Sequence, residues 1–383
     1  MSLIMGLVAC SKEQNLNLGT DNATFIGDNQ LSNDDCKDLI IDFYQKNRGS
    51  EITLKSNEVP EEIELDKTYE VQLTNLRDRE VDKTYVAQYT VKKGNQSGYS
   101  LVVADKRFPM VLVYVPNGNF SDTVEIEPLK AYMRTIPSTL ETLYGKYEED
   151  GELVNYRLNS VVTSNRLATE WHDMAPYNSE IPLTCNSLNA SAGSHTVAVA
   201  QILAQLKRGS YNWTSLLGSS TVSVGEGWRS TEVARLFKDV ATATKTDYIC
   251  HEESRALVSD VVAGCKSLGL PSAYSVAAKD YSTTVNLIVQ ELKKKKSVIM
   301  QGTEYINNRK YSGHYWVVDE AAVSIDGWMT QLHCNWGEAG GKSNGVFTYL
   351  TNNCLLTGTT GIGIPAPTDK NSFRNITIIA GLY

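Results

Sequence analysis

The order in which hydrophobic patterns follow one another constrains the fold of this chain more than any other feature. Short runs of β-branched and aromatic residues occupy residues 69–115, where KKGNQSG between two runs is typical of a hairpin turn. Apolar residues at helical spacing predominate from Ser194 to Lys296, and strand-like runs separated by Gly and Asn return from Ser297 onward. Helices and antiparallel strands in separate blocks predict an α+β fold.

Two helical patterns flank the first block of strands. Residues 31–47 begin with Ser32 as a candidate N-cap, and residues 127–152 predict a helical segment that is interrupted at Pro137. A chain of 383 residues favours two or three domains of ~100 to 200 residues. We therefore expect a leader and linker at 1–29, a small α+β domain with an antiparallel sheet at 30–155, and a second domain at 160–383 with a helical half followed by an antiparallel β-sheet half.

The composition excludes several classes of protein. Hydrophobic residues at 42% and charged residues at 21% are typical of globular domains. The net charge of -8 argues against a nucleic-acid partner, and the basic run Lys293–Lys296 lies at the end of a helical pattern, where lysines favour the helix dipole. Seven cysteines occur without any CxxC spacing, so the sequence predicts no zinc site and leaves disulfide pairing open.

The N-terminal segment MSLIMGLVACSKEQN resembles the end of a bacterial lipoprotein signal. Leu7–Cys10 would be the lipobox and Cys10 the acylated residue, although no Lys or Arg precedes it. The alternative is a leader with a chance cysteine. The first interpretation predicts an exported, cell-surface or secreted protein that contacts a membrane only through a lipid anchor, because no segment approaches the ~20 apolar residues of a membrane span.

The stretch SAGSHTVAVAQIL places Ser194 where a tight turn becomes a helix. Taken alone, this position favours an N-cap, since Ser is common there, although a nucleophile would gain from the helix N-terminus. The rest of the chain changes that balance. His314 follows Gly313 at the start of an apolar strand, and Asn335 and Trp336 follow on the next strand. A strand-borne His beside Asn or Trp suits a general base facing a helix-borne nucleophile.

This order resembles the papain-like cysteine peptidases, and the individual motifs resemble those of the streptopain family. The resemblance extends from about residue 30 to Tyr383. It rests on GYSLVVADKRFPMVLVYVPNGNF for the propeptide signature, WHDMAPYN for the start of the mature enzyme, GSHTVAVAQ for the nucleophile segment, YNW, GHYWVVD for the His strand and NWGEAGGKSNGVF for the Asn-Trp segment.

The resemblance implies a peptidase precursor that hydrolyses peptide bonds through an acyl-enzyme, without a metal or organic cofactor. Ser194 would occupy the nucleophile position, His314 would be the base, and Asn335 and Trp336 would position and shield its imidazole. Gly193 and the adjoining turn would admit the substrate carbonyl, while Gly313 would lie at the rim. The propeptide would inhibit the enzyme intramolecularly until cleavage between about 145 and 165, and the external partner would be a protein or peptide substrate.

Three residues depart from the family pattern. Ser194 replaces the nucleophilic Cys, Asp173 stands where the family has the Gln of the oxyanion hole, and Glu338 replaces a Trp of the active-site rim. Ser194 alone is compatible with an engineered substitution that keeps a zymogen intact, whereas the other two favour a natural pseudopeptidase that binds peptides or proteins at the cell surface. A serine hydrolase that uses Ser194 and His314 is the third hypothesis.

Overall fold

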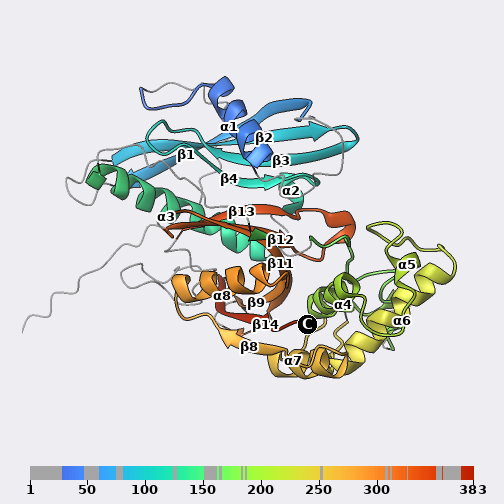
Figure 1. Ribbon diagram of the computed structural model, residues 1–383. Helices are drawn as coiled ribbons and strands as arrows, with labels where there is room; N and C mark the ends of the chain where they lie inside the picture. Colours follow the sequence, from blue (N-terminus) through green and yellow to red (C-terminus); the bar gives the residue numbers. More distant parts are fainter. Residues whose placement is uncertain are drawn as a thin grey trace, which may run out of the picture.

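The computed structural model (Figure 1) describes most of the chain. The described residues are 28–46, 60–74, 81–123, 127–150, 162–163, 166–182, 184–185, 188–250, 253–306, 309–310, 313–325, 327–350, 356 and 372–383. Cys10 and its lipobox, the leader up to residue 27 and most of the 145–165 segment lie outside these residues, so the predictions made for them stay predictions.

A single antiparallel sheet runs through the molecule in the order β1-β2-β3-β4-β13-β12-β11-β9-β14-β8 (Figure 1). β5 pairs with β11, β10 pairs with β9, and β6 and β7 form a separate small ladder. The strands are β1 (Glu62–Thr74), β2 (Val81–Lys93), β3 (Gln96–Val103), β4 (Met110–Val115), β5 (Val162–Thr163), β6 (Thr184–Cys185), β7 (Leu188–Asn189), β8 (Tyr274–Ala277), β9 (Val298–Ile306), β10 (Arg309–Lys310), β11 (His314–Val323), β12 (Met329–Asn335), β13 (Gly345–Leu350) and β14 (Ser372–Ala380).

Helices cover both faces of this sheet. They are α1 (Asn33–Lys46), α2 (Phe120–Thr123), α3 (Glu127–Asp150), α4 (Ser194–Leu206), α5 (Trp213–Leu216), α6 (Trp228–Ala243), α7 (Val258–Ser267), α8 (Tyr281–Lys293) and the 3-10 turn η1 (Ala339–Gly341). The mixed helical and antiparallel fold predicted from the sequence is confirmed, including the helical block followed by a block of strands.

In the N-terminal half, α1 and α3 pack on opposite faces of β1–β4 (Figure 1). Ile40 of α1 lies in one apolar cluster and Leu140 of α3 in another. The predicted interruption at Pro137 is wrong, because α3 continues through it. An internal proline costs about 3 kcal/mol, but burial of the apolar stripe that includes Tyr132 and Leu143 offsets this.

In the C-terminal half, alternate residues of β11 face opposite sides of the sheet. Tyr315 and Val317 pack in the cluster that holds α4 and α6, whereas Trp316 and Val318 pack in the cluster that holds α8 and α3. This is the two-residue period of a strand buried on both faces. The helix α4 is therefore pressed against the sheet close to the first residues of β11.

The two predicted sheets are continuous in the structure, because β4 pairs with β13. Val346 and Phe347 are opposite Tyr114 and Val113. The Tyr132 hydroxyl bridges this junction, lying 2.7 Å from the Thr348 carbonyl oxygen and 2.9 Å from that of Leu112. Strand pairing and a buried hydroxyl thus fix the N-terminal half of the chain against the C-terminal strands.

A second set of contacts closes the same junction at its end. The Asn117 side chain donates an N–H to the Gly340 carbonyl oxygen at 2.9 Å, and the Asn117 main-chain carbonyl oxygen accepts the Ser343 main-chain N–H at 3.0 Å.

Among the described helices, none is long and apolar enough to cross a membrane. Cys36, Cys265 and Cys334 are buried free thiols, and Cys250 is disulfide-bonded.

Candidate active site

Ser194 is the first residue of α4 and is buried, with 4% of its surface exposed. Gly193 is the N-cap residue, with φ of 83°, so Ser194 does not cap the helix. A Cβ at position 193 would lie 2.4 Å from the Ser254 carbonyl oxygen and 2.6 Å from the His195 ring. Glycine is required here both for the positive φ and for the close approach of a neighbouring loop.

The Ser194 hydroxyl oxygen accepts the main-chain N–H of Tyr315 at 3.0 Å. This bond ties the start of α4 to the start of β11, the strand on which His314 is the first residue. Gly313 precedes it because a side chain there would collide with β9, with a Cβ 1.7 Å from the Gly302 carbonyl oxygen. The fold thereby brings residues 194 and 314 together from distant parts of the chain.

His314 contacts a carboxylate rather than the Ser194 hydroxyl. Its Nδ1 lies 3.5 Å from Glu253 Oε2, and its Nε2 lies 2.9 Å from the Trp336 carbonyl oxygen. The other oxygen of Glu253 accepts the Ser194 main-chain N–H at 2.9 Å. Glu253 thus spans the space between the helix N-terminus and the imidazole.

The pKa of His314 is raised and the pKa of Glu253 is lowered in this pair. Burial alone would lower the pKa of His314, but the Glu253 carboxylate outweighs it and raises that pKa to about 9. Burial would raise the pKa of Glu253, but His314 and the hydrogen bonds from Ser194 lower it to about 2. At neutral pH the pair is therefore an imidazolium and a carboxylate. The Glu253 side chain is 41% exposed, so solvent stabilises its charge and weakens its attraction to His314.

Two further carboxyl groups lie close enough to feel these charges. Burial raises the pKa of Asp173, the hydrogen bond from the Ser191 hydroxyl opposes the shift, and the charge of Glu253 adds to it. Burial likewise raises the pKa of Glu338, with His314 opposing and the other two carboxylates adding. The candidate site therefore holds three acidic side chains around one imidazole.

Asn335 is the last residue of β12 and Trp336 follows it, but their side chains make other contacts. The Asn335 amide donates to the Thr169 carbonyl oxygen at 3.0 Å and exchanges bonds with Gln201. The Trp336 ring is fully buried beside Trp316 and Phe347. The contact with His314 comes instead from the main-chain oxygen of Trp336.

The structure places Ser194, Gly193, His314, Asp173 and Glu338 close to one another. It adds two side chains that sequence reasoning missed. Glu253 lies in a loop outside every recognised motif, so only the folded chain places it at Ser194. Gln201 is the last residue of the GSHTVAVAQ segment, but its pairing with Asn335 depends on how α4 meets the sheet.

Comparisons with known proteins agree with the motifs. The family model of the Peptidase C10 family matches residues 204–347, a region that includes His314 and begins on the C-terminal side of Ser194. A solved fragment, residues 39–359 of Prevotella intermedia prointerpain A carrying a cysteine-to-alanine mutation, aligns with a TM-score of 0.55 and 18% identity over 83% of this chain and 99% of that chain.

Active wild-type interpain A cysteine protease from Prevotella intermedia aligns with a TM-score of 0.46 and 20% identity over 59% of this chain and 96% of that chain. A search of curated proteins finds no match. Residues 204–347 thus carry the sequence pattern of the Peptidase C10 family and the chain has the fold of the prointerpain A fragment, so the resemblance to the streptopain family predicted from the motifs is confirmed.

Proposed function

We propose that this chain is a streptopain-like peptidase precursor whose catalytic domain binds peptides and does not hydrolyse them. One observation carries the proposal: the Glu253 carboxylate accepts the Ser194 main-chain N–H and faces His314. In a peptidase of this type, the main-chain N–H of the nucleophile residue is one of the donors that stabilise the oxyanion of the reaction. Here the Glu253 carboxylate already accepts the N–H of Ser194.

The protonation state of His314 supports the same proposal. A serine hydroxyl needs a neutral imidazole to accept its proton during attack, whereas a cysteine can react as a preformed thiolate beside an imidazolium. Glu253 holds His314 as the imidazolium up to about pH 9. Ser194 combined with a protonated His314 is therefore a poor nucleophile at neutral pH.

The third support is electrostatic. Asp173 stands at the position where the family resemblance places an oxyanion-hole Gln, and a carboxyl group cannot donate there once it is ionised. Loss of one oxyanion donor costs about 10² to 10³ in rate. The remaining donor, the Ser194 main-chain N–H, is already bonded to Glu253. Of the two groups that would stabilise the transition state, one is therefore occupied and the other, Asp173, is repulsive when ionised.

We further propose that the N-terminal domain, residues 30–155, is the propeptide, and that Cys10 anchors the exported protein to a membrane by lipid. The β4–β13 pairing supports an intramolecular partner that stays docked until the connection at about 145–165 is cut. Replacement of Cys10 by Ala should release the protein from the membrane fraction of expressing bacteria. Unchanged fractionation would contradict the anchor.

The test measures casein hydrolysis and labelled-peptide binding by the chain before and after proteolytic cleavage at 145–165. We expect binding without hydrolysis for the unaltered protein, and thiol-dependent hydrolysis only when Ser194→Cys is combined with Glu253→Gln. Glu226→Gln, which alters an exposed carboxylate paired with Arg229, is the matched control for the second change.

Two results would overturn the proposal. Hydrolysis by the unaltered chain that is blocked by a fluorophosphonate and is insensitive to thiol reagents would make it a serine hydrolase. Failure of the cleaved chain to bind any labelled peptide, in a preparation whose folding is shown by cooperative thermal unfolding, would remove the binding function.

A further inference from the structure

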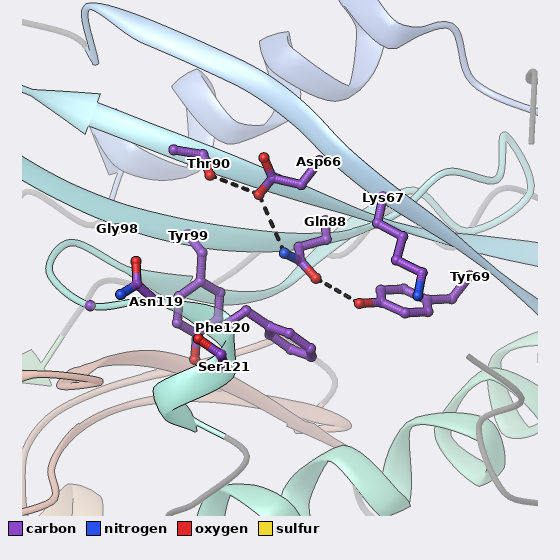
Figure 2. Close-up of a pocket in the computed structure, with 11 residues that line it drawn as sticks. Asp66, Lys67, Tyr69, Gln88, Thr90, Gly98, Tyr99, Asn119, Phe120 and Ser121 are labelled. Carbon is purple, nitrogen blue, oxygen red and sulfur yellow. Dashed lines mark hydrogen bonds between the residues drawn. The ribbon is translucent and has the colours of Figure 1, made fainter. Parts of the chain in front are cut away.

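A cavity of 580 Å³ lies in the N-terminal domain, outside the candidate active site. Figure 2 shows its lining, which combines polar side chains from β1 and β2 with aromatic rings from β1, β3 and α2. Its volume falls within the roughly 300 to 1,000 Å³ of small-molecule binding sites. The lining residues are Asp66, Lys67, Tyr69, Gln88, Thr90, Gly98, Tyr99, Gly118, Asn119, Phe120 and Ser121.

A β-bulge in β1 directs an acidic side chain into this cavity. Leu65 pairs with Tyr89 and Lys67 pairs with Gln88, so Asp66 is an extra residue on one strand. Bulges of this kind change the direction of a side chain and often occur next to functional sites. Leu65 packs on the α1 side of the sheet, and Tyr69 packs on the opposite side, the side on which the cavity opens.

The polar side chains of the cavity form one connected set, drawn with dashed lines in Figure 2. Thr90 donates its hydroxyl to Asp66 Oδ2 at 2.7 Å, and the Gln88 amide donates to the same oxygen at 3.3 Å. The Tyr69 hydroxyl donates to the Gln88 oxygen at 2.6 Å. These bonds fix the orientations of the groups. Asp66 is exposed, and its Oδ1 has no partner among the described residues, so this oxygen can accept a hydrogen bond from a ligand.

An aromatic wall stands across from this polar set. Phe120 is half-buried and lies edge-on to Tyr99, with ring centroids 5.6 Å apart, and 6.2 Å from the Tyr69 ring. The Lys67 ammonium lies 5.1 Å above the Tyr69 ring. One carboxylate and one ammonium therefore face the same space, so the lining carries almost no net charge.

From this lining we propose that the cavity binds a neutral saccharide. A sugar ring presents hydroxyl groups that both donate and accept along its edges, and apolar C–H groups on its faces. The fixed carboxylate, amide and hydroxyl groups match the edges, and the Phe120 ring matches a face. A purely apolar ligand would cover Asp66 Oδ1 without offering it a donor, which is costly.

The charge balance separates this ligand from charged ones. An anion such as a phosphate or a sulfated sugar would be attracted by Lys67 but repelled by Asp66, and a basic peptide side chain would be attracted by Asp66 but repelled by Lys67. A neutral polyhydroxyl ligand meets neither repulsion. The proposal is independent of peptidase activity, since every residue it uses belongs to the N-terminal domain.

The experiment uses the full chain on an array of immobilised neutral and charged glycans, followed by calorimetric titration of soluble cellobiose, maltotriose and N,N′-diacetylchitobiose together with any neutral array hit. We expect saturable binding of at least one neutral saccharide. Asp66→Ala and Phe120→Ala should each weaken it at least tenfold, while Glu64→Ala, an exposed residue of the same strand outside the cavity, should change it less than twofold.

Asp66 is exposed, so its replacement tests binding without removing core packing, whereas Phe120 contacts buried rings. Thermal unfolding of each variant checks that the domain is intact. Absence of binding to every neutral glycan, preferential binding of charged glycans, or equal losses in the Glu64→Ala control would each overturn the proposal.

Discussion

The main-chain N–H of Tyr315 donates to the Ser194 hydroxyl oxygen at 3.0 Å, so the side chain at the predicted nucleophile position also closes a hydrogen bond between α4 and β11. Both residues are buried. Ser194 therefore has a structural role that is separable from any chemistry, and the two roles can be measured apart.

Replacement of Ser194 by Ala should lower the free energy of unfolding by about 1 to 2 kcal/mol, because a buried N–H loses its acceptor. Urea unfolding followed by tryptophan fluorescence measures the change. Ser230→Ala, at an exposed site on α6, is the matched control and should shift stability by less than about 0.5 kcal/mol. Equal effects at the two sites would contradict the structural role of Ser194.

The Glu253–His314 pair predicts a pH-dependent contribution to stability. The pKa of His314 is raised to about 9, so its contribution is complete below the ordinary value of 6.5 and is lost as pH rises toward 9. The pKa of Glu253 is lowered to about 2, so its contribution is present above its ordinary value of 4.5 and is lost as pH falls toward 2.

Glu253→Gln should therefore destabilise the protein most between about pH 4.5 and 6.5, by about 1 kcal/mol after allowance for solvent screening of an exposed carboxylate. Calorimetry at a series of pH values measures the difference from the unaltered chain. The same substitution should lower the pKa of His314, because burial is then opposed mainly by the Glu338 charge and the Trp336 carbonyl oxygen, and an NMR titration reads this directly. An unchanged titration would contradict the ion pair.

Gly193→Ala should destabilise the protein by about 3 kcal/mol or more. The new Cβ would collide with the Ser254 carbonyl oxygen, and the alanine backbone would have to adopt a positive φ. Gly225→Ala provides the control, because its φ of 86° is similar and no atom lies within 4 Å of the added Cβ. That variant should lose only about 1 to 2 kcal/mol. Chemical denaturation measures both free energies of unfolding. Similar losses in the two variants would contradict the prediction, because they would mean that the loop beside Gly193 moves to accommodate the Cβ.

Tyr132→Phe should weaken the junction between the two halves. The change removes the hydroxyl that contacts carbonyl oxygens of β4 and β13, at an expected cost of about 1 to 2 kcal/mol. Tyr85→Phe removes a hydroxyl that makes one long contact at an exposed site, and should be close to neutral. Hydrogen exchange at Phe347 should rise in the first variant only; a rise in both would contradict a specific role for Tyr132.

The sequence predicted most elements because their patterns are local. The strand beginning at His314 and the helix beginning at Ser194 follow from periodicity and from Gly at the turns. Pro137 misled that reasoning, since the burial that carries α3 through the proline is a tertiary effect. The continuity of the sheet across β4 and β13 was likewise invisible, because pairing of strands over 200 residues apart leaves no local signal.

The candidate site divides in the same way. Motif order was enough to predict that Ser194 and His314 approach each other. It could not predict that Glu253 lies between them, since that position depends on how a loop following α6 folds over the start of α4. Nor could it show that Asn335 bonds with Gln201 and Thr169, because partners for a buried amide are fixed by packing.

The pairing of β4 with β13 has a consequence for the catalytic half after any separation. All six residues of β13 are buried in the intact chain, and Val346 and Phe347 have neighbours on both sides. Without β4, this strand would present unpaired peptide groups and apolar side chains at a sheet edge, a surface on which strands from other chains assemble. The N-terminal domain therefore also protects its partner from aggregation for as long as it remains in place.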